Sequence, residues 1–472
     1  MVTNRLRNLI LTAAFLLPAQ GANAHVSEQA FVLLLPTEAY ITGGVLSVLA
    51  SVLIVGFVPR HWLERLFRPL HLPIPSLPRG AADFVSLAAT AVVLGLVLIG
   101  MTGPRDPLTN LLPLMVWVGV WIVLFNFVGV FGDIWRLINP WTGLHRLIFG
   151  RQDSAPLLNL PQNWGVAPAI AGFCLMFGFS IVDPAPADPD RLAQIVLFYW
   201  LFHLVAMVVF GRDTWLTRGE PLTLFFAQIA RVSIISYDKT LRIGCLGWQL
   251  ARGDISAWGP AIFALIILGL GSFDGLKETF WWLGQIGINP LAFPGRTAVI
   301  LPSIIGMILS VATLIALFAL TMWCGQVLGN RAQDAQAKIT VSQMFRVFSP
   351  TILPIALAFH ASHFTVTLLV DGQYLLAAFG DPLAVGANLF GLGDIRVTTG
   401  FLNSMESVRP IWLTQAGIVV LGHVLAVIVA HCRALDLFQS PRAATLSQIP
   451  LGVFMVAYTL FGLWLLASPR GV

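Results

Sequence analysis

The chain has 472 residues, of which 57% are apolar and only 10% are charged, and its mean hydropathy is +0.83. A soluble domain of this length cannot carry so few charges, so the composition excludes a soluble enzyme or binding module and predicts an integral membrane protein. The net charge of +5 fits loops that meet anionic lipid headgroups. We expect the lipid bilayer, and no nucleic acid, as the partner of these charges.

Residues 1–24 have the features of a cleavable secretory signal. Two arginines precede an apolar stretch, Leu9 to Leu17, that is too short to cross a bilayer, and the small-residue sequence at 22–24 is typical of a cleavage site. The mature chain would then begin at His25, whose α-amine and ring Nδ1 can chelate a metal together, an arrangement that suits copper. The other interpretation is that the cleavage site simply happens to precede a histidine.

Ten apolar stretches follow, each long enough to cross about 30 Å of hydrocarbon. Each should be a helix, because backbone polar groups in lipid must be satisfied within the segment. They lie near 38–58, 83–101, 110–132, 164–182, 192–210, 257–273, 298–322, 350–370, 412–430 and 450–467. The sequence therefore predicts an all-α protein, a polytopic transmembrane bundle of about ten spans that forms one domain over residues 25–472.

The charges of the connecting segments predict the orientation. If His25 lies outside, the inner connections carry 18 Lys or Arg residues, whereas the outer connections and the C-terminus carry 7. This asymmetry is the positive-inside bias. We therefore expect a protein of the bacterial inner membrane whose mature N-terminus is periplasmic.

Two connections are longer than a turn. The inner one, 211–256, contains an apolar stretch from Pro221 to Ile235 between arginines, which predicts an interfacial helix on the inner leaflet. The outer one, 371–411, is rich in glycine and holds several carboxylates. A loop of that kind is a candidate lid or binding surface.

Ionisable side chains at membrane depth are costly, so each is a hypothesis for function. His360 and His363 lie three residues apart on one predicted helix and share a face, and His423 lies near the middle of the next span, which runs the opposite way. We predict that the three imidazoles meet at a similar depth toward the periplasmic side. Three histidines and one open position are the ligand set of a catalytic metal centre. The alternative is that these histidines only pack between helices and bond to carbonyls.

Two carboxylates are candidates for a catalytic role. Asp371 lies two turns beyond His363, and Asp274 ends another predicted span on the same outer side. Either could bind the metal or accept a proton from a ligating imidazole. Glu38, at the mouth of the first span, is a third choice, and His25 is an additional or shared ligand.

A transition metal ion, copper or zinc, is the expected cofactor, and haem is its rival. His423 and His431 lie on one predicted helix and could bind two stacked haem groups. His360 or His363 opposite His423 would also give a haem with two imidazole ligands.

Several polar motifs occur in a fixed order after the leader. They are Phe210 to Leu216, Arg218 to Glu220, His360 to Gln373, Asp381-Pro382, Asn388 to Gly391, Gly422 to His431 and Ser447-Gln448. In these motifs the chain resembles the polytopic membrane proteins grouped with bacterial fenitrothion hydrolase. That group has glycine after the first mature histidine, where this chain has Val26. The resemblance implies hydrolysis of an organophosphorus triester, with a second membrane or periplasmic subunit.

The sequence therefore predicts one of three alternative functions. The first is a metal-dependent hydrolase in which metal-bound hydroxide attacks the phosphorus of a small apolar triester. The second is a copper importer or copper-delivery protein that takes the ion at His25 and passes it inward past His363, His360, His423 and His431. The third is a haem-binding electron-transfer protein.

Overall fold

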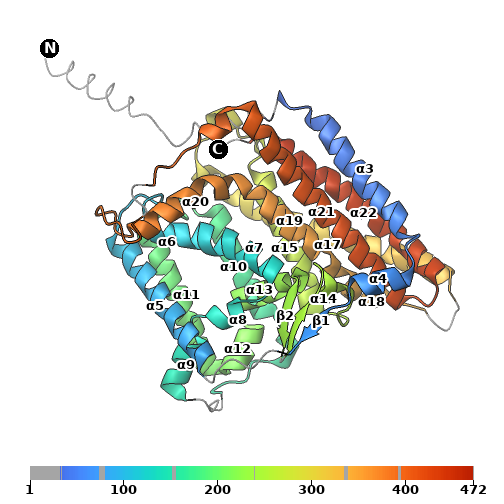
Figure 1. Ribbon diagram of the computed structural model, residues 1–472, viewed down its shortest axis with the longest axis horizontal. Coiled ribbons are helices and arrows are strands. Elements are labelled where there is room, and N and C mark those ends of the chain that lie inside the picture. The colour runs from blue at the N-terminus through green and yellow to red at the C-terminus, as the bar shows by residue number, and fades with distance from the viewer. Residues whose placement is uncertain are drawn as a thin grey trace.

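The computed structural model describes residues 32, 34–73, 80–150, 156–238, 240–333, 338–391 and 395–470. In this part of the chain helices dominate and pack into a bundle, with one small sheet near an end (Figure 1). The predicted helical membrane bundle is thus confirmed in outline. The predicted signal peptide and His25 lie outside the described residues.

Nine helical segments in the described ranges are long and apolar enough to cross a membrane. They are α3 (Thr37–Val55), α5 (Ala81–Thr102), Leu111–Phe131, α11 (Pro189–Phe210), α15 (Trp258–Lys277), Arg296–Arg331, Val341–His363, α21 (Met405–Leu437) and α22 (Pro441–Ala467). Each overlaps one of the ten predicted spans. The remaining predicted span, 164–182, is α10 (Ala167–Val182), an apolar helix of 16 residues that is shorter than the other nine segments.

Three of the long segments consist of shorter pieces. These are α6 (Leu111–Leu114), the π-helical η1 (Met115–Leu124) and α7 (Phe125–Phe131); η5 (Arg296–Val299) and α17 (Ile300–Arg331); and α18 (Val341–Phe348), η7 (Ser349–Ile352) and α19 (Leu353–His363). The other short helices are α4 (Arg60–Leu66), α8 (Trp135–Ile138), α9 (Thr142–Phe149), η2 (Gln162–Trp164), α12 (Arg212–Arg218), α14 (Trp248–Ala251), α16 (Phe280–Gln285), η4 (Pro290–Ala292) and η8 (Gly400–Asn403).

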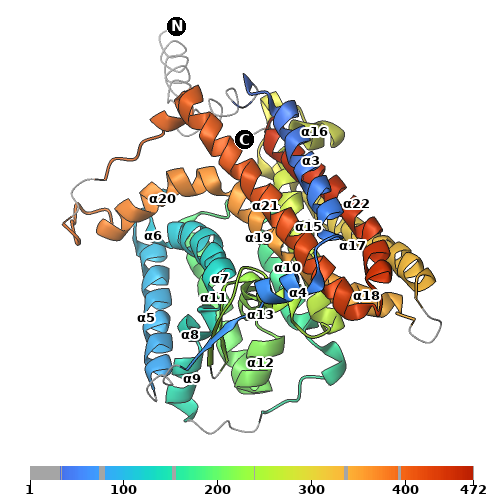
Figure 2. The same cartoon turned by 45° about the vertical axis from the view of Figure 1, so that its right-hand side comes forward.

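The helix α19 lies in the core of the bundle, packed between α15 and α21 (Figure 2), and its first seven residues are all buried. Gly422 of α21 permits a close crossing, because a Cβ there would lie 2.3 Å from Cβ of Ala358 and 2.9 Å from the carbonyl oxygen of Pro354. Small residues have this role where helices cross in membranes. Farther along, Gln415 Nε2 donates a hydrogen bond to the Ser362 carbonyl at 2.9 Å. These contacts fix the register of α19 against α21.

The predicted span 350–370 is wrong at its outer end. The helix α19 ends at His363, Phe364 is not helical, and a separate helix, α20 (Thr365–Gly380), begins immediately after it. Figures 1 and 2 both show α20 turning away from α19 and running toward α6. Asp371 therefore lies on a different helix from His363, so it is not placed two turns above that imidazole on a common axis.

The predicted interfacial helix from Pro221 to Ile235 is also corrected. Its helical part is α13 (Pro221–Ile229), followed by η3 (Ala230–Val232), and the chain is already in a strand at Ile235. The carboxylate of Glu220 caps α13 by accepting from the amides of the two residues after Pro221. Phe225 is 2% exposed and Ile229 is fully buried, in contact with α10 and α7. The apolar side chains therefore pack inside the protein, not against lipid.

One end of the bundle carries a three-stranded antiparallel sheet, and this end is called the sheet end below. Its strands are β1 (Leu70–Leu72), β2 (Ile235–Asp238) and β3 (Thr240–Ile243), in the order β1-β3-β2. The opposite end, where α15 finishes at Lys277 and α16 follows, is called the α16 end.

Candidate metal site

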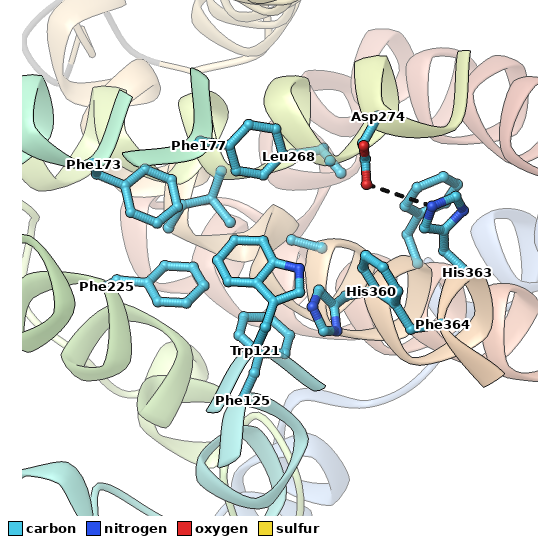
Figure 3. A pocket seen from close by; sticks show the side chains of 14 residues that line it. Trp121, Phe125, Phe173, Phe177, Phe225, Leu268, Asp274, His360, His363 and Phe364 are labelled. Atoms are coloured by element: carbon cyan, nitrogen blue, oxygen red, sulfur yellow. Dashed lines mark ion pairs between the residues drawn. The ribbon is translucent and has the colours of Figure 1, made fainter. Parts of the chain in front are cut away.

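A small cavity lies inside the bundle, between α15 and α19 on one side and η1, α7, α10 and α13 on the other (Figure 3). It is more enclosed than the wide cavity at the sheet end and is called the closed cavity below. Half of the residues that line it are Phe or Trp: Trp121, Phe125, Phe173, Phe177, Phe225, Phe359 and Phe364. Three ionisable side chains complete it, Asp274, His360 and His363. Its free volume is about 30 Å³, and since one water needs at least about 10–15 Å³, it has room for about two water molecules.

His360 is the most unusual polar group of this cavity. Both of its ring nitrogens are buried and have no hydrogen-bond partner among the described residues. Its ring centroid lies 4.0 Å from that of Phe125 and 5.7 Å from that of Trp121, so apolar surfaces surround it. A neutral imidazole offers one donor and one acceptor, and each left unsatisfied costs about 1–3 kcal/mol. This position therefore favours a bound ligand.

His363 occupies the same cavity one turn nearer the α16 end and belongs to a network of charges. Its Nε2 lies 3.5 Å from Asp274 Oδ2, while Lys277 Nζ lies 3.1 Å from Asp274 Oδ1 and 3.0 Å from Glu278 Oε1. Arg470 lies 3.9 Å from the other oxygen of Glu278. Two carboxylates and two cations thus alternate, so the network is close to neutral at the end of α15.

The ring of Phe364 separates the two cavity histidines. Its centroid is 4.7 Å from the ring centroid of His360 and also 4.7 Å from that of His363. Figure 3 shows His363 directed toward Asp274 and His360 lying beside Trp121. The structure therefore brings His360, His363 and Asp274 to one cavity, but gives each imidazole its own surroundings.

His423 does not line this cavity. Its Nδ1 lies 2.9 Å from the Val419 carbonyl oxygen, its Nε2 is buried without a partner in the described chain, and the ring of Tyr458 is 6.3 Å away. The register explains the separation, because Gly422 packs between Pro354 and Ala358. His423 is thus level with residue 355, about one and a half helical turns or ~7 Å nearer the sheet end than His360. The expected common depth does not hold for this histidine.

The other predicted site residues lie apart from the cavity. Asp371 is on α20 and Glu38 is exposed in the first turn of α3. His203 accepts a hydrogen bond from Trp215 Nε1 at 2.9 Å, which explains it as a packing residue. Within the described ranges, no group of three or more His, Cys, Asp or Glu side chains is close enough to hold a metal ion. The predicted three-histidine centre is therefore not assembled in this part of the chain, and His25 lies outside it.

Sequence reasoning missed two polar residues that shape the site. Lys277 follows Asp274 by three residues, a spacing that places both on one helical face. The ion pair could therefore have been predicted from the sequence. Gln415 gave no such signal, because its contact with Ser362 depends on the register of two helices. The aromatic wall was likewise not predictable, since its rings come from four separate segments of the chain.

No family model, curated protein or solved structure matches the chain. The resemblance to the fenitrothion hydrolase group accordingly stays a prediction. The function has to be argued from the residues of the cavity and from their surroundings.

Proposed function

We propose that the protein takes up or delivers copper across the membrane, and that it binds the ion at His360 and His363 with the carboxylate of Asp274 nearby. The observation that carries this proposal is His360, which lines a cavity inside the bundle and whose two buried ring nitrogens have no partner in the described chain. A neutral imidazole has a lone pair that binds transition metals. A bound ion would satisfy a group that otherwise destabilises the fold.

The size of the cavity supports an ion as the ligand. A volume of about 30 Å³ accommodates an ion that has shed its water shell, whereas haem or a phosphotriester could enter only if several aromatic rings moved aside. Among the three expected functions, ion transfer therefore needs the smallest change from the observed arrangement. The haem alternative has no support from this geometry.

The ligand set supports copper over zinc. A catalytic zinc ion takes three protein ligands, and no three candidate ligands among the described residues are close enough to share one ion. Divalent copper binds nitrogen ligands more strongly than zinc does. Monovalent copper, the reduced form, is stable with only two ligands. The two cavity imidazoles suit copper better for this reason, provided that the Phe364 ring between them moves aside when the ion binds.

Lys277 offers a physical route for entry. With no ion bound, its ammonium group compensates Asp274 and Glu278 at the α16 end. A cation that reaches Asp274 would displace Lys277 toward Glu278 and then pass to His363 and His360. The positive-inside bias supports placing the sheet end in the cytoplasm and the α16 end in the periplasm of a bacterial inner membrane. His25 would then stand on the side where the ion arrives.

The test is the copper content of the full-length protein purified in detergent, measured by mass spectrometry after loading with Cu(I). We expect near-stoichiometric copper in the wild type and a loss in His360→Phe and His363→Phe. His61→Phe, at an exposed position of α4, is the matched control and should keep its copper. A wild type that binds no copper, or equal loss in all three variants, would contradict the proposal. Cytoplasmic copper in cells with and without the protein then tests uptake.

A phosphotriester hydrolase is the second candidate, and it is supported by the aromatic wall, which suits an aryl ester, together with the sequence resemblance. It requires the cavity to open. Release of nitrophenol from a nitrophenyl phosphotriester by the copper- or zinc-loaded protein tests it. Copper uptake without nitrophenol release would favour transport, and the reverse result would favour hydrolysis.

A further inference from the structure

A second cavity opens at the sheet end, among the residues that follow α13 and those around α14. Its volume is about 480 Å³, within the range of roughly 300–1,000 Å³ that is typical of small-molecule sites. Three arginines line it, Arg231, Arg242 and Arg252. Among the side chains that the structure describes, Asp254 is the only carboxylate that lines it, and this residue is exposed.

The three guanidinium groups of this basic cavity have neutral partners. Arg231 Nη1 lies 3.3 Å from Gln228 Oε1 and 3.3 Å from Ser256 Oγ. Arg252 donates to the backbone carbonyls of residues 64 and 67. No carboxylate within the described ranges forms an ion pair with either arginine. Burial and the charge of Arg433 lower the pKa of Arg231 to about 10, so it stays charged at neutral pH.

Arg242 is positioned by the sheet. It lies opposite Ser236 in the β2–β3 pair, so both side chains share a face, and its Nη2 donates to Ser236 Oγ at 3.3 Å. Its guanidinium carbon is 5.5 Å from the ring centroid of Trp248, a cation–π contact that holds the group over the ring. Its Nε is buried and has no partner in the described chain. One of the arginines that line the cavity thus has an unsatisfied cationic donor.

We propose that this basic cavity binds a phosphate group. Guanidinium groups match phosphate oxygens in geometry and donate charge-assisted hydrogen bonds to them. The amides of Gln228 and Gln249 also line the cavity and can donate to further oxygens. A phosphate would compensate the excess positive charge, and it would satisfy Arg242 Nε if that buried atom turned toward the cavity.

The mouth of the cavity favours a phospholipid headgroup as the source of that phosphate. Ile255, which lines the cavity, is 43% exposed, and Trp258, which follows the lining residue Ala257 at the first position of α15, is 48% exposed. Tryptophan at the end of a membrane-spanning helix is typical of the interface where headgroups lie. Basic pockets at the cytoplasmic side of helical membrane proteins bind anionic headgroups in this way. A soluble phosphate ester would use the same donors.

The experiment uses the full-length protein in neutral detergent and measures its thermal unfolding with added phosphatidylglycerol, phosphatidylcholine or inorganic phosphate. Phosphatidylglycerol should raise the unfolding temperature, and phosphatidylcholine should have little effect. Removing one guanidinium in Arg231→Gln or Arg242→Gln should weaken the binding about tenfold or more, because each loses hydrogen bonds to a charged group. Arg136→Gln removes an equal charge at an exposed position of α8 outside the cavity and should bind like the wild type.

The outcomes separate the sources. Stabilisation by phosphatidylglycerol alone assigns the cavity to a lipid headgroup, and equal stabilisation by inorganic phosphate assigns it to a soluble phosphate. No response to either ligand, or an equal loss in Arg136→Gln and Arg231→Gln, would overturn the proposal. Arg231→Lys keeps the charge and should retain part of the binding, which guards against loss through misfolding. Copper content should be unchanged in all these variants, so this inference stands apart from the proposed function.

Discussion

The cavity around His360 and the basic cavity around Arg242 both hold buried polar nitrogens without partners, but the two differ in kind. The first is the more enclosed, has seven Phe or Trp residues among the 14 that line it, and is about 30 Å³ in volume, whereas the second is more open, polar and about 480 Å³. An unsatisfied imidazole offers a lone pair to a cation, and an unsatisfied guanidinium offers protons to an anion. The type of the orphaned atom therefore indicates the charge of the missing ligand, and the volume limits its size.

The largest expected effect concerns the charge network beside the closed cavity. Replacing Lys277 by Met leaves Asp274 and Glu278 without their shared cation, and losing one partner of a buried pair costs about 3–5 kcal/mol. Thermal or denaturant unfolding in detergent measures this loss. The double variant Asp274→Asn with Lys277→Met removes both signs of charge and should recover most of it. Equal stability of the single variant and the wild type would show that the network does not hold α15 in place.

The next effect tests whether helix packing positions the closed cavity. A methyl group added in Gly422→Ala would fall 2.3 Å from Cβ of Ala358, forcing α21 away from α19, and overpacking of this kind costs about 1–3 kcal/mol. Gly417→Ala is the matched control on the same helix, because no atom lies within 4 Å of its added Cβ. We expect lower stability and weaker copper binding only in Gly422→Ala. Phosphate binding at the sheet end should not change in either variant.

The two cavities also differ in how far the sequence predicts them. The helices follow from apolar runs, which must be helical in lipid, and Asp274, His360 and His363 were recognisable as costly groups at membrane depth. The depth of His423 was not predictable, because it depends on the register that Gly422 and Gln415 impose. No glycine or proline marks the break between α19 and α20 at residue 364.

The basic cavity was even harder to predict from the sequence. Its arginines are spread over 22 positions, from Arg231 to Arg252, and they converge only because the β2–β3 hairpin folds back over α14. The apolar run of α13 led to the wrong prediction of an interfacial helix for a similar reason. An apolar helix packed in protein and one lying on lipid have the same composition. In both places tertiary contacts, not local patterns, decide the structure.

A smaller effect, on the stability of the metal-free protein, tests whether His360 binds a ligand or only packs between helices. In metal-free protein, His360→Phe removes two unsatisfied nitrogens and keeps an aromatic ring among aromatic neighbours, so stability should stay equal or rise by about 1 kcal/mol. His203→Phe is the contrasting variant, because it takes the acceptor from Trp215 Nε1 and should destabilise the protein. Unfolding temperatures of the metal-free proteins decide this. A clear loss of stability in His360→Phe would show that the imidazole has a structural partner and would weaken the copper proposal.

The smallest expected effect is a difference in salt dependence between the two cavities. Raising the ionic strength from 0.1 M to 1 M shortens the screening length from about 10 Å to about 3 Å. The binding of phosphatidylglycerol at the basic cavity should therefore weaken several-fold. Copper bound in the closed cavity, as proposed, would be shielded from mobile ions by the aromatic rings, and its affinity should change little. Titrations of both ligands at the two salt concentrations measure the contrast. Equal salt dependence would mean that the copper site is open to water, and Lys277 would then face solvent instead of closing the path to His363.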